Sequence, residues 1–315
     1  MAARRQGGRW MWWLLGGTAL IGLALAGVGL RTLPGSPLSA EAASRWEGTG
    51  PSTASTSGSA PASPLAPAKP SPSPSPTPKP SPSVKPLAVR PAKVTIDATG
   101  WWSWSMIDRR TGKVYGSSNM AQTNTTASLI KSWIAADYLR RAAASGQTPS
   151  AARMQQLTIM IRDSDNEAAQ SLWEEIGGSA SIGRLVKTCK LTDSSAYKNL
   201  WSNTRLSARD TARLGVCIAD GRAAGPKWTK WLLNEMRAVR GVGDFGIRKA
   251  FPASTQKNIA IKNGWVTRDA LGEWHVNCLA IGDGWTMGVM TRYPVSLGYE
   301  YGAKICENVA RQLKS

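Results

Sequence analysis

The residues of this chain that could perform chemistry begin with a serine and a lysine three positions apart. In Ser128-Leu129-Ile130-Lys131 this spacing places the amine one helical turn from the hydroxyl, at the start of the helical segment SLIKSWIAADYLRR. The chain has a single histidine, His275, and no G-x-S-x-G motif. Because a serine activated without histidine needs another base, the pattern indicates Ser128 as a nucleophile and Lys131 as its base.

The S-x-x-K spacing alone is weak, since residues 195–198 and 254–257 repeat it in segments expected to be surface loops. Two further motifs follow Ser128 in the chain. Ser164-Asp165-Asn166 lies at a junction between two expected helices, and Lys262-Asn263-Gly264 lies on an expected strand just before Trp265. The three motifs together supply two hydroxyls, two amines and two amides for one pocket.

In this order the motifs resemble the S-x-x-K, S-D-N and K-[TS]-G signature of the penicillin-recognising serine hydrolases, and the S-D-N stretch looks most like class A β-lactamases. The resemblance covers about residues 95–315. It implies that Ser128 is acylated, that Lys131 accepts its proton, and that Ser164 relays a proton to the leaving nitrogen. Lys262 would raise the positive potential beside Ser164.

The resemblance also implies a substrate-binding set. Asn166 would bind the lysine and the substrate amide, and the backbone N–H groups of Ser128 and Trp265, which follows Gly264, would form an oxyanion hole. Asn263 replaces the usual hydroxyl residue, although its amide can still donate to a substrate carboxylate. For His275 two interpretations stay open: a partner for that carboxylate, or a half-buried, hydrogen-bonded strand residue.

One feature of the class A pattern is missing. The glutamate that positions water for deacylation has no counterpart in residues 193–210, DSSAYKNLWSNTRLSARD. Asp193 and Asp210 are candidate substitutes, but a turn residue and a helix-start residue are the expectation. The sequence therefore predicts weak turnover, with an acyl group that stays attached.

No metal or organic cofactor is expected. The single His and the absence of C-x-x-C exclude multi-His and thiolate zinc sites. Asp163, Asp165 and Glu167 crowd together, and we expect them to cap a helix rather than to bind a cation. Three tryptophans of the first expected strand are candidates for sugar stacking, with packing as the alternative: Trp101, Trp102 and Trp104.

Both strands and helices must position these residues. Strands are expected at 94–108, 113–118, 259–266, 275–281 and 286–293, and helices at 128–144, 150–162, 166–176, 179–188, 207–219, 226–239 and 297–313. This order predicts an α+β fold, in which a five-stranded antiparallel sheet is built from both chain ends and an all-helical subdomain is inserted.

The N-terminal region reads as an export signal and a spacer. Arg4, Arg5 and Arg9 precede the uncharged apolar run 10–30, which is long enough to span about 30 Å of bilayer as a helix. We expect residues 1–44 to be a membrane anchor with the domain outside the cytoplasm, a cleaved signal peptide being the alternative. Thirteen of the 19 prolines lie within 51–91, so residues 45–93 predict a disordered linker ahead of a domain at 94–315.

Export also bears on the cysteines, which should pair outside the cytoplasm. Cys189 with Cys217 and Cys278 with Cys306 are the favoured pairs, and other connectivities stay open. The net charge of +19 suggests an anionic cell wall or membrane surface as partner, or a solvated basic surface with none, rather than nucleic acid.

These observations predict an exported, monomeric serine acyl hydrolase that takes β-lactams or peptides resembling peptidoglycan stem peptides. The alternatives are a peptidoglycan D,D-peptidase and a non-catalytic module that binds cell-wall fragments or β-lactams.

Overall fold

The sheet at the centre of the fold joins the two ends of the domain. The computed structural model describes residues 86–315. The strand order is β2-β1-β8-β7-β5, all antiparallel, and β6 pairs with β7. The six strands are β1 (Trp101–Asp108), β2 (Val114–Gly116), β5 (Ala260–Ile261), β6 (Gly264–Arg268), β7 (Glu273–Gly282) and β8 (Trp285–Pro294). The α+β prediction, with a sheet drawn from both chain ends, is confirmed.

Two of the expected strands differ in extent from the observed ones. The strand expected at 259–266 is divided at Lys262 and Asn263 into β5 and β6, so five expected strands become six, although Lys262 N–H still donates to Leu279 O at 3.2 Å. The first strand begins only at Trp101. Residues 94–100 are not part of this strand, and Thr95 N–H instead donates to Gln312 Oε1 of the last helix at 3.0 Å.

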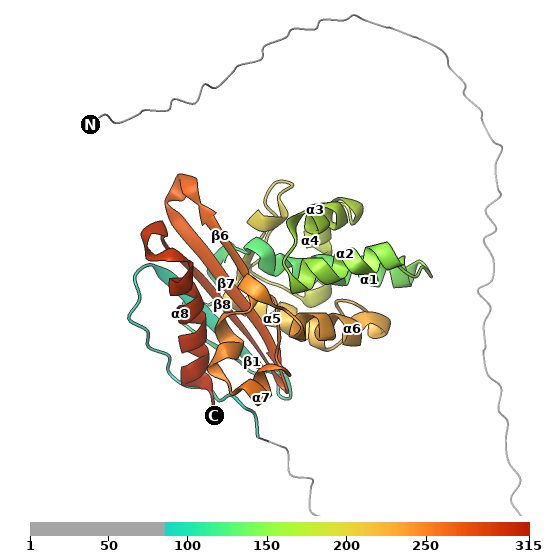
Figure 1. Ribbon diagram of the computed structural model, residues 1–315. Helices are drawn as coiled ribbons and strands as arrows, with labels where there is room; N and C mark the ends of the chain where they lie inside the picture. Colours follow the sequence, from blue (N-terminus) through green and yellow to red (C-terminus); the bar gives the residue numbers. More distant parts are fainter. Residues whose placement is uncertain (1–85) are drawn as a thin grey trace, which may run out of the picture. The chain divides into compact units, whose positions relative to one another are not determined.

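Helices cover both faces of the sheet (Figure 1). They are α1 (Lys131–Ala144), α2 (Ala151–Arg162), α3 (Asn166–Glu175), α4 (Ala180–Cys189), α5 (Ala208–Ala219), α6 (Pro226–Arg237), α7 (Ala253–Gln256) and α8 (Gly298–Leu313). α8 packs on one face and α5 on the other, with the remaining long helices beyond α5. Gly288 of β8 permits the α5 contact, because a Cβ there would lie 2.6 Å from Ala208 O.

A small second sheet was not expected from the sequence. β3 (Thr123–Thr125) pairs with β4 (Arg205–Ser207), and the paired residues Thr125 and Arg205 are 80 positions apart in the chain. Each strand has only three residues, too few for an alternating pattern to be recognised. The pair joins the segment before Ser128 to the end of the loop that precedes α5.

Two disulfides tie helices to their neighbours. Cys189 of α4 is bonded to Cys217 of α5, and Cys278 of β7 is bonded to Cys306 of α8. These are the pairs that the sequence favoured. The first lies within the helical block and the second fixes α8 to the sheet.

Residues that precede the expected domain boundary at 94 already pack against the domain. Val89 is 2% exposed and forms a bridge with Lys314, and Arg90 N–H donates to Leu313 O at 2.7 Å. These residues therefore belong to the domain, because Val89 buries its side chain in the core. The expected anchor at 1–44 and the linker up to residue 85 lie outside the described residues. Within residues 86–315 no helix has the length and apolar character needed to span a bilayer.

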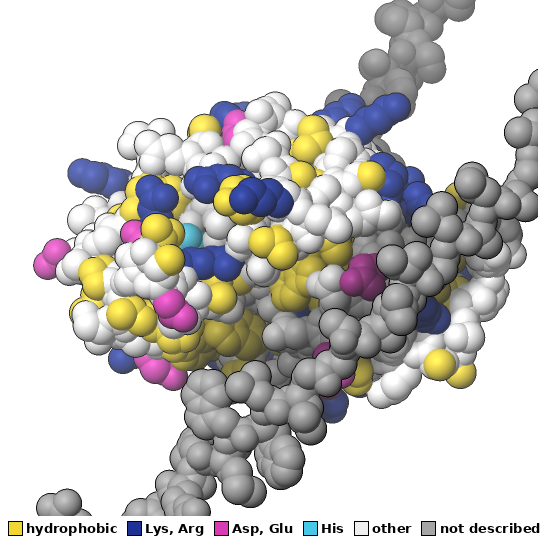
Figure 2. Space-filling model, turned by 90° about the horizontal axis from the view of Figure 1, so that it is seen from above, with side chains coloured by type: hydrophobic (Ala, Val, Ile, Leu, Met, Phe, Trp, Pro, Cys, Tyr) yellow, Lys and Arg dark blue, Asp and Glu magenta, His cyan; other side chains and the backbone are white. Residues whose placement is uncertain are grey.

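The domain carries an excess of basic side chains. Residues 92–315 contain 30 Lys and Arg against 18 Asp and Glu. Figure 2 shows Lys and Arg spread over one face rather than gathered in a single patch. The excess gives the domain a positive field.

Candidate active site

Ser128 lies in a tight turn that leads into α1. Residues Ala127–Ile130 form a 3₁₀ turn, and the α-helix begins at Lys131 instead of at Ser128. Ser128 is 8% exposed, and the preceding Ala127 has φ 47°, in the left-handed region that non-glycine residues rarely adopt. Strained backbone of this kind is concentrated at functional sites, where the surrounding structure holds it in place.

The amine of Lys131 is held by the S-D-N segment. Lys131 Nζ donates to Ser164 O at 2.6 Å and to Asn166 Oδ1 at 2.7 Å, and it lies 3.5 Å from Ser164 Oγ. A neutral amine has two N–H donors and one lone pair, so these two acceptors leave the lone pair free to take a proton.

The lowered pKa of Lys131 suits a role as a base. Its side chain is completely buried, and burial lowers the pKa to about 7, although the nearby Asp165 carboxylate acts in the opposite direction. Desolvation disfavours the ammonium form because water no longer solvates the charge. Near neutral pH a large fraction of Lys131 is therefore unprotonated.

Lys262 approaches the same hydroxyl from the sheet. Lys262 Nζ donates to Ser164 Oγ at 3.0 Å, and Ser164 itself has φ 62°. Burial first, and the Lys131 amine second, keep the pKa of Lys262 well below its usual range. Ser164 thus lies between two amines, and since its oxygen accepts from Lys262 its own proton can be donated elsewhere.

Gly264 brings the strand with Lys262 against the Ser128 turn. A Cβ at Gly264 would lie 2.2 Å from Thr126 O and 2.8 Å from Ser128 N, so only glycine permits this approach. Trp265 follows on β6 and is partly exposed. The backbone of the expected oxyanion pair, Ser128 and Trp265, is therefore brought together at this point.

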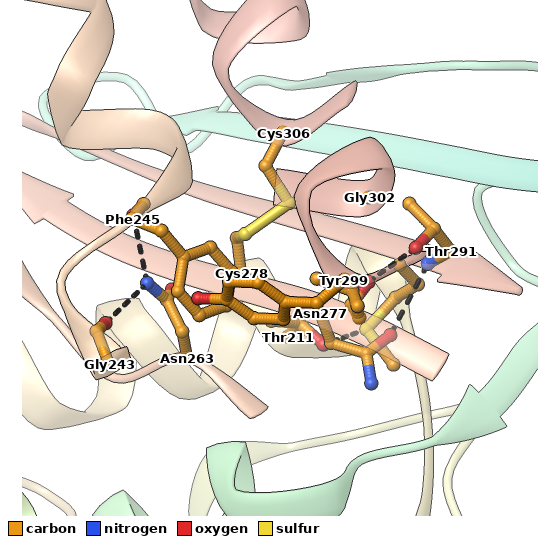
Figure 3. The surroundings of a disulfide bond; sticks show 12 residues. Thr211, Gly243, Phe245, Asn263, Asn277, Cys278, Thr291, Tyr299, Gly302 and Cys306 are labelled. Atoms are coloured by element: carbon orange, nitrogen blue, oxygen red, sulfur yellow. Dashed lines mark hydrogen bonds between the residues drawn. A yellow bond between two sulfur atoms is a disulfide. The ribbon is translucent and has the colours of Figure 1, made fainter. Parts of the chain in front are cut away.

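Asn263 does not present its amide to the site. Its Nδ2 donates to Gly243 O at 3.1 Å and to Phe245 O at 2.9 Å, next to the Cys278–Cys306 disulfide (Figure 3). The residue is 1% exposed. Both amide hydrogens are used to hold the 243–245 loop, which corrects the expectation that they donate to a substrate carboxylate.

His275 is engaged on both sides of its ring. Nδ1 lies 2.6 Å from Thr125 Oγ1 and Nε2 lies 3.1 Å from Glu273 Oε2. A carboxylate only accepts, so Nε2 carries the hydrogen and Nδ1 accepts from the Thr125 hydroxyl. Burial lowers the His275 pKa, and the residue is 3% exposed. These contacts fit the buried strand residue, not the carboxylate partner.

The acids near the site have structural partners. Asp210 accepts from Asp193 N–H and from Ser194 Oγ, each at 2.7 Å, while Asp193 accepts from Ser207 Oγ at 2.7 Å and from Arg209. Asp193 is thus the turn residue and Asp210 the helix-start residue that the sequence favoured.

The acids in and beside the S-D-N motif also have structural partners. Asp165 caps α3 by accepting from Ala168 N–H at 2.7 Å, and Asp163 pairs with Arg240 at 2.6 Å. Neither contact resembles a cation site.

The aromatic residues divide between packing and the site. Trp104 is 4% exposed and belongs to the core, and Trp101 donates from Nε1 to Gln122 Oε1 at 2.7 Å. Trp201, which the sequence did not single out, places its ring centroid 4.8 Å from Lys131 Nζ. No spacing rule links positions 131 and 201, so this contact was not visible in the sequence.

Comparison with known proteins identifies the fold and the family. Residues 145–314 match the model of the Beta-lactamase enzyme family, a range that includes the S-D-N and K-N-G motifs and leaves Ser128 and Lys131 just outside. Among solved structures, the TLA-1 extended-spectrum β-lactamase superimposes with a TM-score of 0.58 at 15% identity, over 68% of this chain and 92% of that chain. A β-lactamase from Burkholderia vietnamiensis gives 0.56 at 17% identity, over 68% and 89%. These two likenesses concern the fold.

Curated relatives occur in mycobacteria. Proteins of Mycobacterium tuberculosis and Mycobacterium bovis, each named "Putative lipoprotein LppW", are 28% identical over 203 residues. The match covers 62% of this chain and 64% of the relatives, so the chain spans just under two thirds of their length.

Proposed function

The chain belongs to the β-lactamase enzyme family, and we propose that it is a serine acyl hydrolase that forms an acyl-enzyme on Ser128. The observation that carries the proposal is the pair of short contacts from Lys131 Nζ, 2.6 Å to Ser164 O and 2.7 Å to Asn166 Oδ1. They hold a buried amine one helical turn after the serine. The substrates would be β-lactams or peptides resembling peptidoglycan stem peptides.

The proposed acylation involves three proton transfers. Ser128 Oγ attacks the amide carbon and forms the C–O bond while Lys131 takes the hydroxyl proton. The C–N bond then breaks, and Ser164 gives its proton to the leaving nitrogen while it recovers one from Lys131. Lys262, which donates to Ser164 Oγ at 3.0 Å, supplies positive potential beside this hydroxyl. Backbone N–H groups of Ser128 and Trp265 would stabilise the oxyanion.

Turnover of the acyl-enzyme is proposed to be slow. Asp193 and Asp210 are the only acids between residues 193 and 210, and their carboxylates bind Ser207, Arg209 and backbone N–H groups instead of facing Lys131. The same observation favours a second candidate, a D,D-peptidase, for which slow hydrolysis of β-lactams is the expected side reaction.

We propose that the domain works outside the cytoplasm. The apolar run 10–30 after three arginines supports membrane attachment, and the mycobacterial relatives carry a lipoprotein name. All four cysteines of this chain are in disulfides, so none is free to carry a lipid. The apolar run would therefore be the anchor, and the positive field of the domain suits an anionic envelope.

Covalent labelling tests the function directly. The full chain is incubated with a fluorescent penicillin, and the intact mass is followed over time. We expect a stoichiometric adduct in the parent protein, none in Ser128→Ala, and unchanged labelling in Ser195→Ala, which alters the serine of an exposed S-x-x-K copy. Labelling that persists in Ser128→Ala would remove the assignment. A protein that binds the probe without forming any adduct or releasing D-Ala from a model peptide would be a binding module.

A further inference from the structure

The indole ring of Trp201 covers the catalytic amine. Trp201 lies in a 3₁₀ turn, η2 (Trp201–Asn203), and its ring centroid is 4.8 Å from Lys131 Nζ. The indole Nε1 donates to Gln170 Oε1 of α3 at 3.0 Å. The ring is therefore fixed at one edge to the helix that follows the S-D-N motif.

The backbone around Trp201 is tied down on both sides. Ser195 and Arg205, which flank Trp201 in the chain, exchange hydrogen bonds of 3.0 and 2.9 Å. After it, Arg268 Nη2 donates to Ser202 O at 2.9 Å, and Thr126 N–H donates to Thr204 O at 2.9 Å. The last bond joins the loop to the residue two positions before Ser128. These contacts hold the ring in a defined place.

The distance leaves no space for water between the ring and the amine. A water bonded to Nζ would lie about 2.9 Å from it, and its contact with the ring carbons would require about 3.5 Å more. Along the line to the ring centre the two distances add to about 6 Å. The observed 4.8 Å is shorter, so the ring side of Lys131 is dry.

Hydrolysis of an acyl-enzyme needs such a water. Its oxygen must form a bond to the ester carbon while a base takes a proton, and the bond from that carbon to Ser128 Oγ then breaks as the serine regains a proton. Lys131 is the proposed base for Ser128, its two N–H groups are bound by Ser164 O and Asn166 Oδ1, and the Trp201 ring restricts the space in which a water could reach the amine.

We propose that Trp201 excludes the deacylating water from Lys131 and thereby makes the acyl-enzyme long-lived. The inference rests on the proposed acylation of Ser128. It assigns Trp201 as a positioning residue that acts on the second half of the reaction only, because acylation needs a proton transfer from Ser128 and no water.

Decay of the adduct tests this. The full chain and its variants are labelled with fluorescent penicillin, chased with excess unlabelled penicillin, and the adduct is followed by intact mass and fluorescence. We expect Trp201→Ala to lose the adduct at least tenfold faster than the parent, and Trp201→Phe, which keeps an aromatic ring, to stay within about threefold. Labelling rates should change little in either variant.

Two further variants keep the test decisive. Gln170→Ala removes the partner of the indole N–H from an exposed position that does not threaten folding, and we expect it to speed decay severalfold. Tyr197→Ala removes an exposed ring from the same loop and should leave decay unchanged. Equal decay in the parent, Trp201→Ala and Gln170→Ala would overturn the role of Trp201 while leaving the acylation intact. A parent protein that forms no adduct would instead overturn the proposed function, and this inference with it.

Discussion

Lys262 donates a hydrogen bond of 3.0 Å to the hydroxyl oxygen of Ser164, although the two residues are 98 positions apart in the chain. The bond joins the sheet to the turn between α2 and α3, and Lys131 Nζ lies 3.5 Å from the same Ser164 Oγ. Two buried amines around one hydroxyl cannot both carry a proton at little cost, because like charges in a poorly solvated site repel. Burial lowers the pKa of both lysines, and the Lys131 amine lowers the pKa of Lys262 further.

The rate of acylation should rise with pH. Burial lowers the pKa of Lys131 to about 7, and only the unprotonated amine can accept the Ser128 proton. Below that pKa the rate should fall roughly tenfold per pH unit, and above it the rate should level off. Labelling rates with fluorescent penicillin between about pH 5.5 and 8.5 check this. A profile without a rise near neutrality would mean that Lys131 is not the base.

Replacing Ser164 should slow bond breaking without unfolding the protein. In Ser164→Ala the leaving nitrogen loses its proton donor, and we expect labelling to slow by about a hundredfold. Ser145→Ala, at an exposed serine after α1, serves as the matched control and should label like the parent. Normal labelling in Ser164→Ala would remove the proton relay from the mechanism.

Lys262→Met should separate activity from stability. The pKa of Lys262 is lowered in the folded state, so at neutral pH the unfolded chain binds more protons at this position and the amine disfavours folding. An apolar side chain of similar length lacks this penalty. We therefore expect urea unfolding to show equal or greater stability, while labelling slows at least tenfold. A clear loss of stability would contradict the assigned burial effect.

Asn263→Thr should weaken the loop that Asn263 holds. Threonine would restore the hydroxyl of the family signature, but it leaves Gly243 O and Phe245 O without the amide donors. We expect a loss of about 1–3 kcal/mol in the free energy of unfolding, measured with urea. Asn258→Thr, at an exposed asparagine, should change stability little. Unchanged stability in Asn263→Thr would show that the loop does not depend on this amide.

The two disulfides should differ in their effect on the site. Each closes a sequence separation of 28, so replacing either pair by serines should lower stability by about 3–4 kcal/mol. Loss of Cys278–Cys306 should also slow labelling, because Gly246 packs against Cys278 Sγ and Cys306 Cβ beside the loop held by Asn263. Loss of Cys189–Cys217, within α4 and α5, should leave labelling unchanged at a temperature where both variants are folded. Equal labelling in both would disconnect this loop from the site.

Several features of this protein were determined by the sequence itself. The helical and strand periodicities placed the sheet and every α-helix of residues 86–315 except the four-residue α7, since they reflect which side chains of one segment must be buried together. The order of three motifs indicated Ser128, Lys131, Ser164 and Lys262. Likewise, Asp165 at the start of α3 and Asp210 at the start of α5 were recognisable from their positions before apolar helical runs.

Only the tertiary structure decided which partner each remaining polar or aromatic group takes. Asn263 turns to the carbonyls of residues 243 and 245, His275 binds Thr125 and Glu273, and Trp201 covers Lys131. In each case several acceptors or contacts compete, and the winner depends on the packing of segments far apart in the chain. Local patterns record burial, whereas the choice among competing hydrogen-bond partners is made when those segments meet.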